Sequence, residues 1–333
     1  MLVISRAPFR VSFVGGGTDY PVWYRESEGA VLGTSIDKYC YISCRYLPPL
    51  FDYKHQVVYS KIERVREISD IKHPSIRETL KFIGITDGIE IHHNRDIPAR
   101  TGLGSSSTFT VGLLHALHTL KGMAVTKTQL ALQAIHIEQD IIKENVGSQD
   151  QTHAAFGGFN RIDFSGNHNI QVTPVIMQPE RLKQLQDHLM LLFTGFVRPQ
   201  DASKIVARQI KVTPQRKREL RMIYEMVDEA MKILGSNCDL SEFGRLLHAS
   251  WCLKKSLTDF ISTPKIDSIY DAARKAGAIG GKLLGAGGGG FLLLFVSPEL
   301  QSKVKESLGS LLSVPFRFEH YGSQIIFKEV KGG

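Results

Sequence analysis

The sequence predicts an α+β fold in two domains, because its length suits two units and its strands and helices are unevenly distributed. The chain has 333 residues, and domains commonly contain roughly 100–200 residues. Strand-like segments dominate its first part, whereas helical patterns dominate its second part. We therefore expect an N-terminal domain over residues 1–180 and a C-terminal domain over residues 181–333.

Short runs of β-branched, aromatic and other apolar residues predict the strands of the first domain. These strands are expected at residues 2–8, 10–14, 30–36, 40–46, 56–59, 90–93, 159–164 and 170–175. Apolar residues at helical spacing predict two helices, at residues 106–120 and 126–145. Thr126 is the expected N-cap of the second helix, because its hydroxyl can accept a hydrogen bond from an amide of the first turn.

The second domain is predicted to be mostly helical. Long helices are expected at residues 215–234, 240–257 and 264–276. A strand is expected at residues 189–193, and two more, at residues 281–284 and 290–296, flank a run of glycines. A half rich in helices that follows a half rich in strands is the pattern behind the α+β prediction.

Charge and composition are those of an ordinary globular protein. The net charge is +8, but basic residues are scattered, and no nucleic-acid-reading motif is present. The longest apolar run, residues 291–296, is far too short to span a membrane, and no signal peptide is evident. We therefore expect neither a nucleic-acid partner nor a membrane.

The cysteines favour a reducing compartment. They form neither a paired CxxC metal motif nor a disulfide framework. The four positions are Cys40, Cys44, Cys238 and Cys252. Free thiols are typical of cytoplasmic proteins, so the cytoplasm is the expected location.

The most informative segment is Pro98-Ala-Arg-Thr-Gly-Leu-Gly-Ser-Ser-Ser107, which joins a predicted strand to a predicted helix. Glycines let backbone amides approach a ligand closely, and a helix N-terminus attracts anions through its unpaired amides and its dipole. The segment has neither the lysine of a Walker loop nor the glycine spacing of a dinucleotide-binding loop. It predicts a phosphate-binding loop, and a tight turn before a serine-capped helix is the alternative.

Two further glycine-rich segments lie nearer the ends of the chain. In residues 7–20, Arg10 and Asp19 stand in an otherwise apolar stretch. Because buried charges are costly unless paired, we expect them to line a polar site or to form an ion pair under a turn. Residues 282–290 require unusual backbone angles or a close neighbour, and a glycine hairpin is the simpler explanation.

Two carboxylates complete the candidate site. Glu138 lies on a largely apolar face of a predicted helix, so it is expected to have a metal ion or a buried cation as its partner. Asp150 follows the end of that helix among polar residues. A capping role in the loop is the alternative to a functional role for Asp150.

The three glycine-rich segments, in this order, resemble those of the GHMP kinase superfamily, named after galactokinase, homoserine kinase, mevalonate kinase and phosphomevalonate kinase. The resemblance runs from residue 2 to about residue 296. It implies an N-terminal domain like domain 2 of ribosomal protein S5 and a C-terminal domain like ferredoxin, with the active site between them. It also implies ATP as co-substrate, Mg²⁺ as cofactor and a small-molecule alcohol as acceptor.

The resemblance assigns roles to individual residues. Asp150 matches the catalytic aspartate of the sugar-kinase branch, and Arg10 is expected beside it, where the opposite charge would keep the carboxylate ionised. Ser106 and Glu138 match the magnesium-binding residues. The residues expected to bind ATP are Arg100, Gly102, Leu103, Gly104, Ser105, Ser106, Ser107 and Gly287.

Within the superfamily, the resemblance is strongest to the D-glycero-D-manno-heptose 7-phosphate kinases. It implies phosphorylation of the anomeric hydroxyl to give heptose 1,7-bisphosphate, for nucleotide-activated heptose and surface polysaccharide. Gly16 and Gly17 replace a Glu-His pair of galactokinases, which is expected to open space for a longer sugar. The residues expected to bind the phosphorylated sugar are Gly17, Thr18, Asp19, Arg198, Lys254 and Lys255.

Two alternatives remain at this stage. A GHMP kinase acting on fucose or on another unphosphorylated sugar would carry the same motifs, and turnover of free against phosphorylated sugar separates the two. A sensor that binds sugar or nucleotide without catalysis would need neither Glu138 nor Asp150. The sequence leaves the oligomeric state open, with a homodimer as one possibility.

Overall fold

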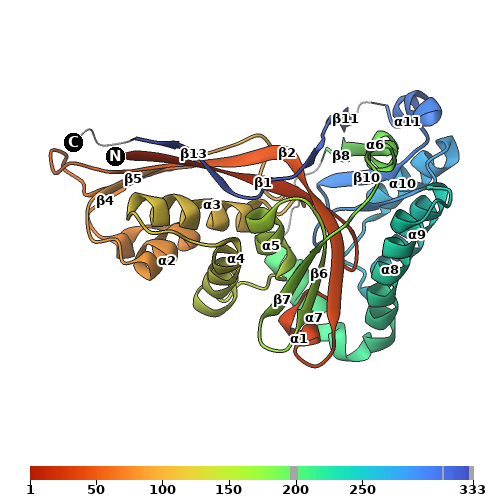
Figure 1. Ribbon diagram of the computed structural model, residues 1–333, viewed down its shortest axis with the longest axis horizontal. Helices are drawn as coiled ribbons and strands as arrows, with labels where there is room; N and C mark the ends of the chain where they lie inside the picture. Colours follow the sequence, from red (N-terminus) through yellow and green to blue (C-terminus); the bar gives the residue numbers. More distant parts are fainter. Residues whose placement is uncertain (196–201, 310, 330–333) are drawn as a thin grey trace.

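Two sheets at opposite ends of the molecule, each covered by helices, form the protein (Figure 1). The computed structural model describes residues 1–195, 202–309 and 311–329. The larger sheet has nine strands and the smaller has four. Within the described ranges, no helix is both long enough and apolar enough to cross a membrane.

The larger sheet is built around β1 (Leu2–Val14) and β2 (Gly29–Tyr46), which pair antiparallel along most of their length. Its main path runs β13-β1-β2-β5-β3-β4, and β6 and β7 form a hairpin beside the first part of β2. The other strands are β3 (His55–Val58), β4 (Ile62–Val65), β5 (Ile89–Arg95), β6 (Phe159–Ser165), β7 (Asn169–Pro174), β12 (Phe318–Glu319) and β13 (Gln324–Lys328).

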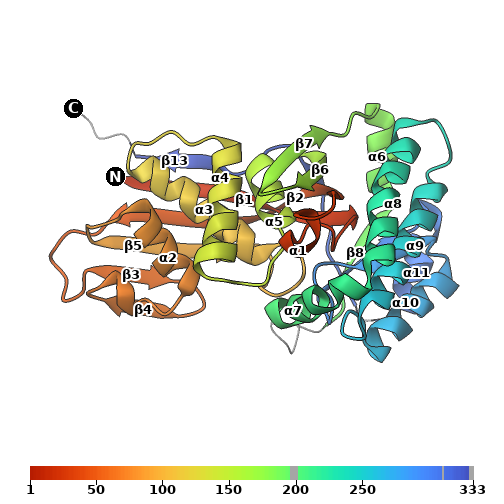
Figure 2. The ribbon, with the colours of Figure 1, turned by 90° about the horizontal axis from the view of Figure 1, so that it is seen from below.

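Helices cover one face of this sheet (Figures 1 and 2). They are α2 (Pro74–Ile83), α3 (Ser105–Leu120), α4 (Lys127–Ile135) and α5 (Gln149–Phe156). The central helix α3 packs closely on the sheet, because Gly112 leaves room for Ile42 and its carbonyl accepts a 2.7 Å hydrogen bond from Ser5 Oγ. This packing fixes the position of the N-terminus of α3.

The second half of the chain forms the smaller sheet, in the order β11-β8-β10-β9, with helices around it. The strands are β8 (Leu189–Phe193), β9 (Gly280–Leu283), β10 (Phe291–Phe295) and β11 (Leu312–Ser313). The helices are α6 (Pro179–Asp187), α7 (Ala202–Val212), α8 (Lys217–Gly235), α9 (Ser241–Leu257), α10 (Pro264–Ala276) and α11 (Gln301–Ser307). Short elements link these parts: α1 (Pro21–Tyr24), η1 (Ile68–Asp70), η3 (Thr213–Gln215) and η4 (Pro298–Leu300).

Aromatic packing at the end of β1 joins the two halves. The Phe13 ring centroid lies 5.3 Å from that of Phe159 on β6 and 5.5 Å from that of Phe243 on α9. Lys282 on β9 donates a 2.7 Å hydrogen bond from Nζ to the Phe13 carbonyl. The turn that follows β1 is therefore held by both halves of the protein.

The last strands of the chain return to the first sheet. β13 pairs antiparallel with β1, and β12 pairs antiparallel with β2. The larger sheet thus contains both the beginning and the end of the chain. The division at residue 180 stays a prediction, and these strands would belong to the N-terminal unit.

Several predicted elements are longer or shorter than expected. The predicted strands at 2–8 and 10–14 form one strand, with a shift of register between Pro8 and Phe9, and those at 30–36 and 40–46 form β2. The proline that suggested a break is accommodated at an irregularity in the pairing.

The helix predicted at 126–145 ends early. Thr126 caps α4 in a capping box with Gln129, as predicted, but α4 ends at Ile135. The chain continues as a π-helical turn, η2 (His136–Ile141). Such a turn contains one extra residue and changes the direction in which its side chains point, and it occurs frequently at functional sites.

We expect Gly290→Ala to lower the free energy of unfolding by about 3 kcal/mol, as the sum of left-handed backbone strain and overpacking. Gly290 has a φ of 109°, and an added Cβ would overlap the carbonyl of Thr101, beside the glycine loop. Chemical denaturation would measure the loss. In the matched control Gly122→Ala, φ is 72° and no atom lies within 4 Å of the added Cβ, so only the strain of about 1 kcal/mol is expected. Equal losses would show that the contact with Thr101 contributes nothing.

Candidate active site

The glycine loop before α3 presents backbone amides at a helix N-terminus. Gly102 and Gly104 adopt φ values of 92° and 83°, and Gly104 is the N-cap of α3. The amide of Thr108 donates to the Gly104 carbonyl, so the amides of residues 105–107 precede the first hydrogen bond of the helix. These amides and the positive end of the helix dipole can bind an anion.

Arg10 connects three parts of the site. It is buried on β1, and its Nε and Nη2 lie 2.8 Å and 2.7 Å from Oδ1 of Asp150. Its Nη1 donates a 2.6 Å hydrogen bond to the carbonyl of Gly102, and its backbone amide donates to the carbonyl of Leu103. One guanidinium therefore holds the glycine loop against the first turn of α5.

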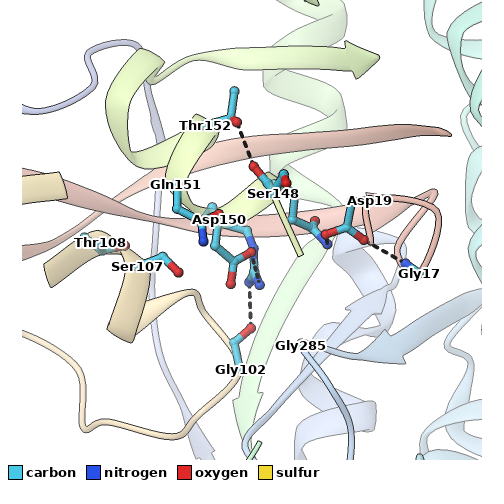
Figure 3. Close-up of polar contacts among 12 residues, drawn as sticks. Gly17, Asp19, Gly102, Ser107, Thr108, Ser148, Asp150, Gln151, Thr152 and Gly285 are labelled. Carbon is cyan, nitrogen blue, oxygen red and sulfur yellow. Dashed lines mark hydrogen bonds and ion pairs between the residues drawn. The ribbon is translucent and has the colours of Figure 1, made fainter. Parts of the chain in front are cut away.

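Asp150 and the glycine loop are in direct contact. A Cβ on Gly104 would lie 3.3 Å from Cγ of Asp150, so glycine allows the loop to approach this carboxylate closely. Asp150 lies in the first turn of α5, whereas the sequence suggested a loop. Figure 3 shows Asp150 between Ser107 on one side and Asp19 on the other, with Gly102 below. This helix is short, at eight residues, and its first turn is polar, which explains why the sequence did not reveal it.

Asp19 lies beside this group, completely buried. It accepts a 2.9 Å hydrogen bond from the Gly17 amide and a 2.9 Å hydrogen bond from Nε2 of Gln149. Burial raises the pKa of Asp19, and the Asp150 carboxylate raises it further, while the Gly17 amide lowers it. An added Cβ on Gly147 would overlap the Asp19 carboxylate, so glycine is needed at that position.

Glu138 is held by three hydrogen bonds inside the protein. Thr110 Oγ1 donates to one carboxylate oxygen at 2.6 Å, and Ser107 Oγ and Gln151 Nε2 donate to the other at 2.8 Å and 2.6 Å. Burial raises the pKa of Glu138 to about 7, although these hydrogen bonds act in the opposite direction. The π-helical turn η2 carries this side chain.

The donors around Glu138 fit a magnesium ion in their chemistry. Magnesium prefers oxygen ligands and commonly takes one or two protein carboxylates, with water and phosphate oxygens completing its shell. Besides the carboxylate, two hydroxyls lie here, and Oε1 of the buried Gln151 has no hydrogen-bond partner among the described residues. Ser106 does not bond Glu138; its side chain is exposed in the first turn of α3, whereas Ser107 makes the contact. Ser107 was expected among the ATP-binding residues, and its hydrogen bond to Glu138 also places it beside the predicted metal ligand.

The third glycine-rich segment, residues 282–290, packs against the glycine loop. The amide of Phe291 donates to the carbonyl of Thr101, immediately before Gly102. Gly287, with a φ of 112°, packs against the backbone of Ile261, where an added Cβ would lie 2.6 Å from the carbonyl oxygen. The segment therefore supports the glycine loop from the other half of the protein.

Two lysines of the second half approach the turn after β1. Lys254 Nζ donates a 2.7 Å hydrogen bond to the Gly285 carbonyl, and it lies 3.9 Å from the position of a Cβ on Gly16. Lys282 is completely buried, and its pKa is lowered well below the ordinary value by burial and by the charges of Lys254 and Arg10. The sequence had not indicated a role for Lys282.

Two residues that were expected to bind the sugar, Thr18 and Lys255, have partners within the protein. The Thr18 hydroxyl donates to the carbonyls of Gly15 and Ala30 and accepts from the Ala30 amide, so it stabilises the turn rather than facing a ligand. Lys255 forms a 2.9 Å ion pair with Asp267, because it follows Lys254 on α9 and points to a different side of the helix. Both side chains thus have partners within the protein that the sequence did not predict.

Three other predicted residues are placed differently or cannot be placed. The Leu103 side chain is fully buried in the core, so only its backbone belongs to the loop. Arg100 is exposed and has a φ of 63°. Arg198 lies outside the described residues.

Of three consecutive contacts made by α5, the sequence predicted Asp150 beside Arg10 and missed the contacts of the two glutamines. Gln149 bonds Asp19, Asp150 bonds Arg10, and Gln151 bonds Glu138. The polar run that follows Gly147 was the only signal available, since glutamine has no charge that demands a partner. Thr110 was missed as well, because one hydroxyl on an apolar helix is unremarkable in a sequence.

A helix N-terminus opened by glycines, with carboxylates and an arginine beside it, is the arrangement of an ATP-dependent phosphotransferase, whose chemistry depends on positioning and charge neutralisation. Family models agree with this assignment. The model of the GHMP kinases N terminal domain matches residues 71–158, and the model of the GHMP kinases C terminal domain matches residues 236–313. The chain therefore carries the N-terminal and C-terminal domains of the GHMP kinases.

Individual relatives include enzymes that act on different substrates. The D-glycero-alpha-D-manno-heptose 7-phosphate kinase of Campylobacter jejuni is 27% identical over 307 residues, which cover 88% of this chain and 89% of the relative. The bifunctional fucokinase/GDP-fucose pyrophosphorylase of Arabidopsis thaliana is 25% identical to this chain. The match covers 90% of this chain and 31% of that longer protein.

A solved structure shares the fold. The crystal structure of a D-glycero-D-manno-heptose 1-phosphate kinase from Bacteroides thetaiotaomicron has a TM-score of 0.73 and 23% sequence identity. The match covers 99% of this chain and 100% of that one. At this level of identity the comparison shows the two-domain fold alone, and it agrees with the α+β prediction.

We expect Glu138→Gln to stabilise the ligand-free protein at pH 8 while it lowers turnover by at least ~10²-fold, in the range of a lost catalytic group. The pKa of Glu138 is about 7, above its ordinary value of 4.5. The wild-type protein therefore loses stability as the pH rises from about 4.5 to about 7, and the variant does not. Thermal denaturation at pH 5 and pH 8 would measure this difference.

Glu63→Gln is the matched control, with the opposite sign. Burial acts to raise the pKa of Glu63, but hydrogen bonds from the Lys72 amide and Tyr59 outweigh it, so the pKa is lowered. This variant should lose stability at pH 8 and keep its activity. If Glu138→Gln melted at a lower temperature than the wild type at pH 8, that result would contradict our account of Glu138.

Proposed function

We propose that this protein uses ATP to phosphorylate the anomeric hydroxyl of D-glycero-D-manno-heptose 7-phosphate, giving heptose 1,7-bisphosphate. The observation that carries the proposal is the group of polar side chains around Gly16. A Cβ on Gly16 would meet Gln149 Nε2 at 3.8 Å, Lys254 Nζ at 3.9 Å and Ser12 Oγ at 4.0 Å. Amide, hydroxyl and ammonium groups suit an acceptor that carries both hydroxyls and a phosphate.

Unsatisfied hydrogen-bonding groups support a polar acceptor. Ser12 Oγ and Gln149 Oε1 are buried and have no hydrogen-bond partner among the described residues. Buried polar groups are nearly always paired in folded proteins, and a group left unpaired costs about 1–3 kcal/mol. Sugar hydroxyls can both donate and accept, so they can satisfy both atoms.

Two of the relatives support heptose as the sugar. The Campylobacter jejuni relative is named for heptose 7-phosphate. The protein from Bacteroides thetaiotaomicron is named for heptose 1-phosphate, and the Arabidopsis thaliana relative for fucose. A fucose kinase is the second candidate, and it would need no cation for an acceptor phosphate.

In the proposed mechanism the glycine loop binds the nucleotide. The amides of residues 102–107 would hold the ATP phosphates, with Arg100 and Gly287 at the edges of this region. Glu138, Ser106 and Ser107 would hold Mg²⁺, which supplies neutralisation of phosphate charge. Two of these groups, Ser107 and Glu138, are already joined by a hydrogen bond, and Gln151 donates a second hydrogen bond to Glu138.

Asp150 would act on the acceptor hydroxyl. Its Oδ1 is engaged by Arg10, and no partner is recorded for its Oδ2 among the described residues. Oδ2 would accept or polarise the proton of the anomeric hydroxyl as the hydroxyl oxygen attacks the γ-phosphorus, and the bond between that phosphorus and the β–γ bridging oxygen would break to release ADP. Asp19 would orient the sugar, and Lys254 would bind its phosphate. A reaction that consumes ATP to prepare sugars for activation fits a location in the cytoplasm, which we include in the proposal.

Asp150→Asn should lower kcat by at least ~10²-fold, because the amide cannot take a proton, and should leave ATP affinity nearly unchanged. Steady-state kinetics and calorimetric titration with ATP would measure both. Asp163→Asn is the matched control, since Asp163 also pairs with an arginine, Arg161, at 2.8 Å on β6. Near-normal turnover by Asp150→Asn would remove Asp150 from the chemistry.

The proposed substrate is tested with a panel of acceptors, ATP and Mg²⁺. The panel contains heptose 7-phosphate, heptose 1-phosphate, free heptose, L-fucose and galactose, and phosphorus NMR locates the new phosphate. We expect the highest kcat/KM for heptose 7-phosphate, with the phosphate on the anomeric oxygen. A preference for a free sugar would contradict the proposal, and binding without turnover of any sugar would indicate a sensor.

A further inference from the structure

We propose that Gln209, on helix α7, is a specificity-determining residue that hydrogen-bonds the acceptor sugar from the C-terminal half of the protein. The inference rests on the proposed function, because it requires a polyhydroxylated acceptor beside Gly16. It adds a residue that the glycine-rich motifs do not contain.

The first observation is an unsatisfied buried amide. Gln209 is only 2% exposed, and neither its Nε2 nor its Oε1 has a hydrogen-bond partner among the described residues. A primary amide in this state leaves two donors and one acceptor unused. Such an unpaired group normally marks a place where water or a ligand binds.

The second observation is where this amide lies. A Cβ on Gly17 would be 2.7 Å from Gln209 Nε2, so the amide lies directly beside the backbone of Gly17. The Gly17 amide in turn donates to Asp19. The other neighbour of Gly17 is the apolar Leu220, 3.4 Å from the same Cβ position, which offers no hydrogen bond.

The contact with Gln209 changes the role that the sequence suggested for Gly16 and Gly17. The sequence suggested that Gly16 and Gly17 both open space for a longer sugar. At Gly17 the space is taken by Gln209, and φ is 110°, so a side chain there would be strained as well. At Gly16 the nearest atom to an added Cβ is 3.8 Å away. Gly16 therefore leaves room for the sugar. The missing side chain at Gly17 lets the Gln209 amide approach the backbone of the turn.

Contacts on several sides set the position of α7. The Asn145 amide donates a 3.2 Å hydrogen bond to Ser203 Oγ, which links α7 to the segment that leads into α5. Ile205 packs against Gly288 of the third glycine-rich segment. Both ribbon views show α7 beside α1, at the junction of the two halves (Figures 1 and 2). Gln209 is therefore directed at the turn by a helix that contacts the rest of the site.

The chemistry of the amide matches neighbouring hydroxyls of one sugar. Its N–H can donate to one hydroxyl oxygen while its carbonyl accepts from the next. Gln209, Ser12 and Gln149 then contribute polar atoms around Gly16 and Gly17 from three different elements. A site built to bond hydroxyls rejects analogues that lack them, because its own polar groups are then left unpaired.

The experiment replaces Gln209 with methionine, which is similar in size and has no hydrogen-bonding amide. We expect Gln209→Met to raise the KM of heptose 7-phosphate about 10- to 100-fold, the effect of one to two lost hydrogen bonds to an uncharged ligand. The KM of ATP should change less than about twofold, and the melting temperature should not fall, because an unpaired buried amide has been removed. Gln184→Met, at an exposed position of α6, is the control.

Deoxy analogues of the acceptor separate binding from structure. In the wild type, the analogue that lacks the contacted hydroxyl should lose the same factor in kcat/KM, and Gln209→Met should lose nothing further on that analogue. Equal acceptor KM in Gln209→Met and wild type would overturn the inference, as would parallel losses for acceptor and ATP with a lowered melting temperature.

Failure of the substrate proposal is a separate outcome. If the wild type turns over a different sugar of the panel, the proposed function is wrong, and the same comparison on that sugar still decides the role of Gln209. If it turns over none of the sugars, both the proposed function and the role of Gln209 are overturned.

Discussion

Three successive side chains at the start of α5 hold the charged groups of the site together. Gln149 bonds Asp19, Asp150 bonds Arg10, and Gln151 bonds Glu138. Arg10 and Asp19 belong to β1 and the turn after it, whereas Glu138 belongs to η2. Arg10 extends the connection to the glycine loop through the Gly102 carbonyl. In a buried site these bonds matter, because an unpaired charge there is far more costly than one at the surface. The position of one short helix thus determines where anion-binding amides and carboxylates meet.

Glycines make this convergence sterically possible. Gly104 lets the loop touch Asp150, Gly147 lets the chain pass Asp19, and Gly290 lets the second half approach Thr101. At each of these positions a side chain would meet backbone or a carboxylate that has little freedom to move. The two halves also share the aromatic cluster around Phe13, so the geometry of the site depends on how the domains pack. Distant glycine-rich segments therefore act as one structural unit.

The sequence predicted the parts of the site better than their connections. The α+β class, the capping of α4 by Thr126 and the bounds of α10 are as predicted, since apolar spacing and capping residues determine them locally. Asp150 was assigned to a loop, and the π-helical turn at Glu138 was missed, because both depend on contacts with distant parts of the chain. The partners of Lys255 and Thr18 were not predicted for the same reason: residue type reveals a charge or a hydroxyl, but not its partner.

The most direct test of the account is a crystal structure with Mg²⁺ and a non-hydrolysable ATP analogue. The account predicts the triphosphate along the amides of residues 102–107, its terminal phosphate facing Asp150 and the metal ion in contact with Glu138. The Arg10–Asp150 pair should remain intact in that complex. A triphosphate bound away from the glycine loop, or a metal ion without Glu138 in its surroundings, would contradict the central claim.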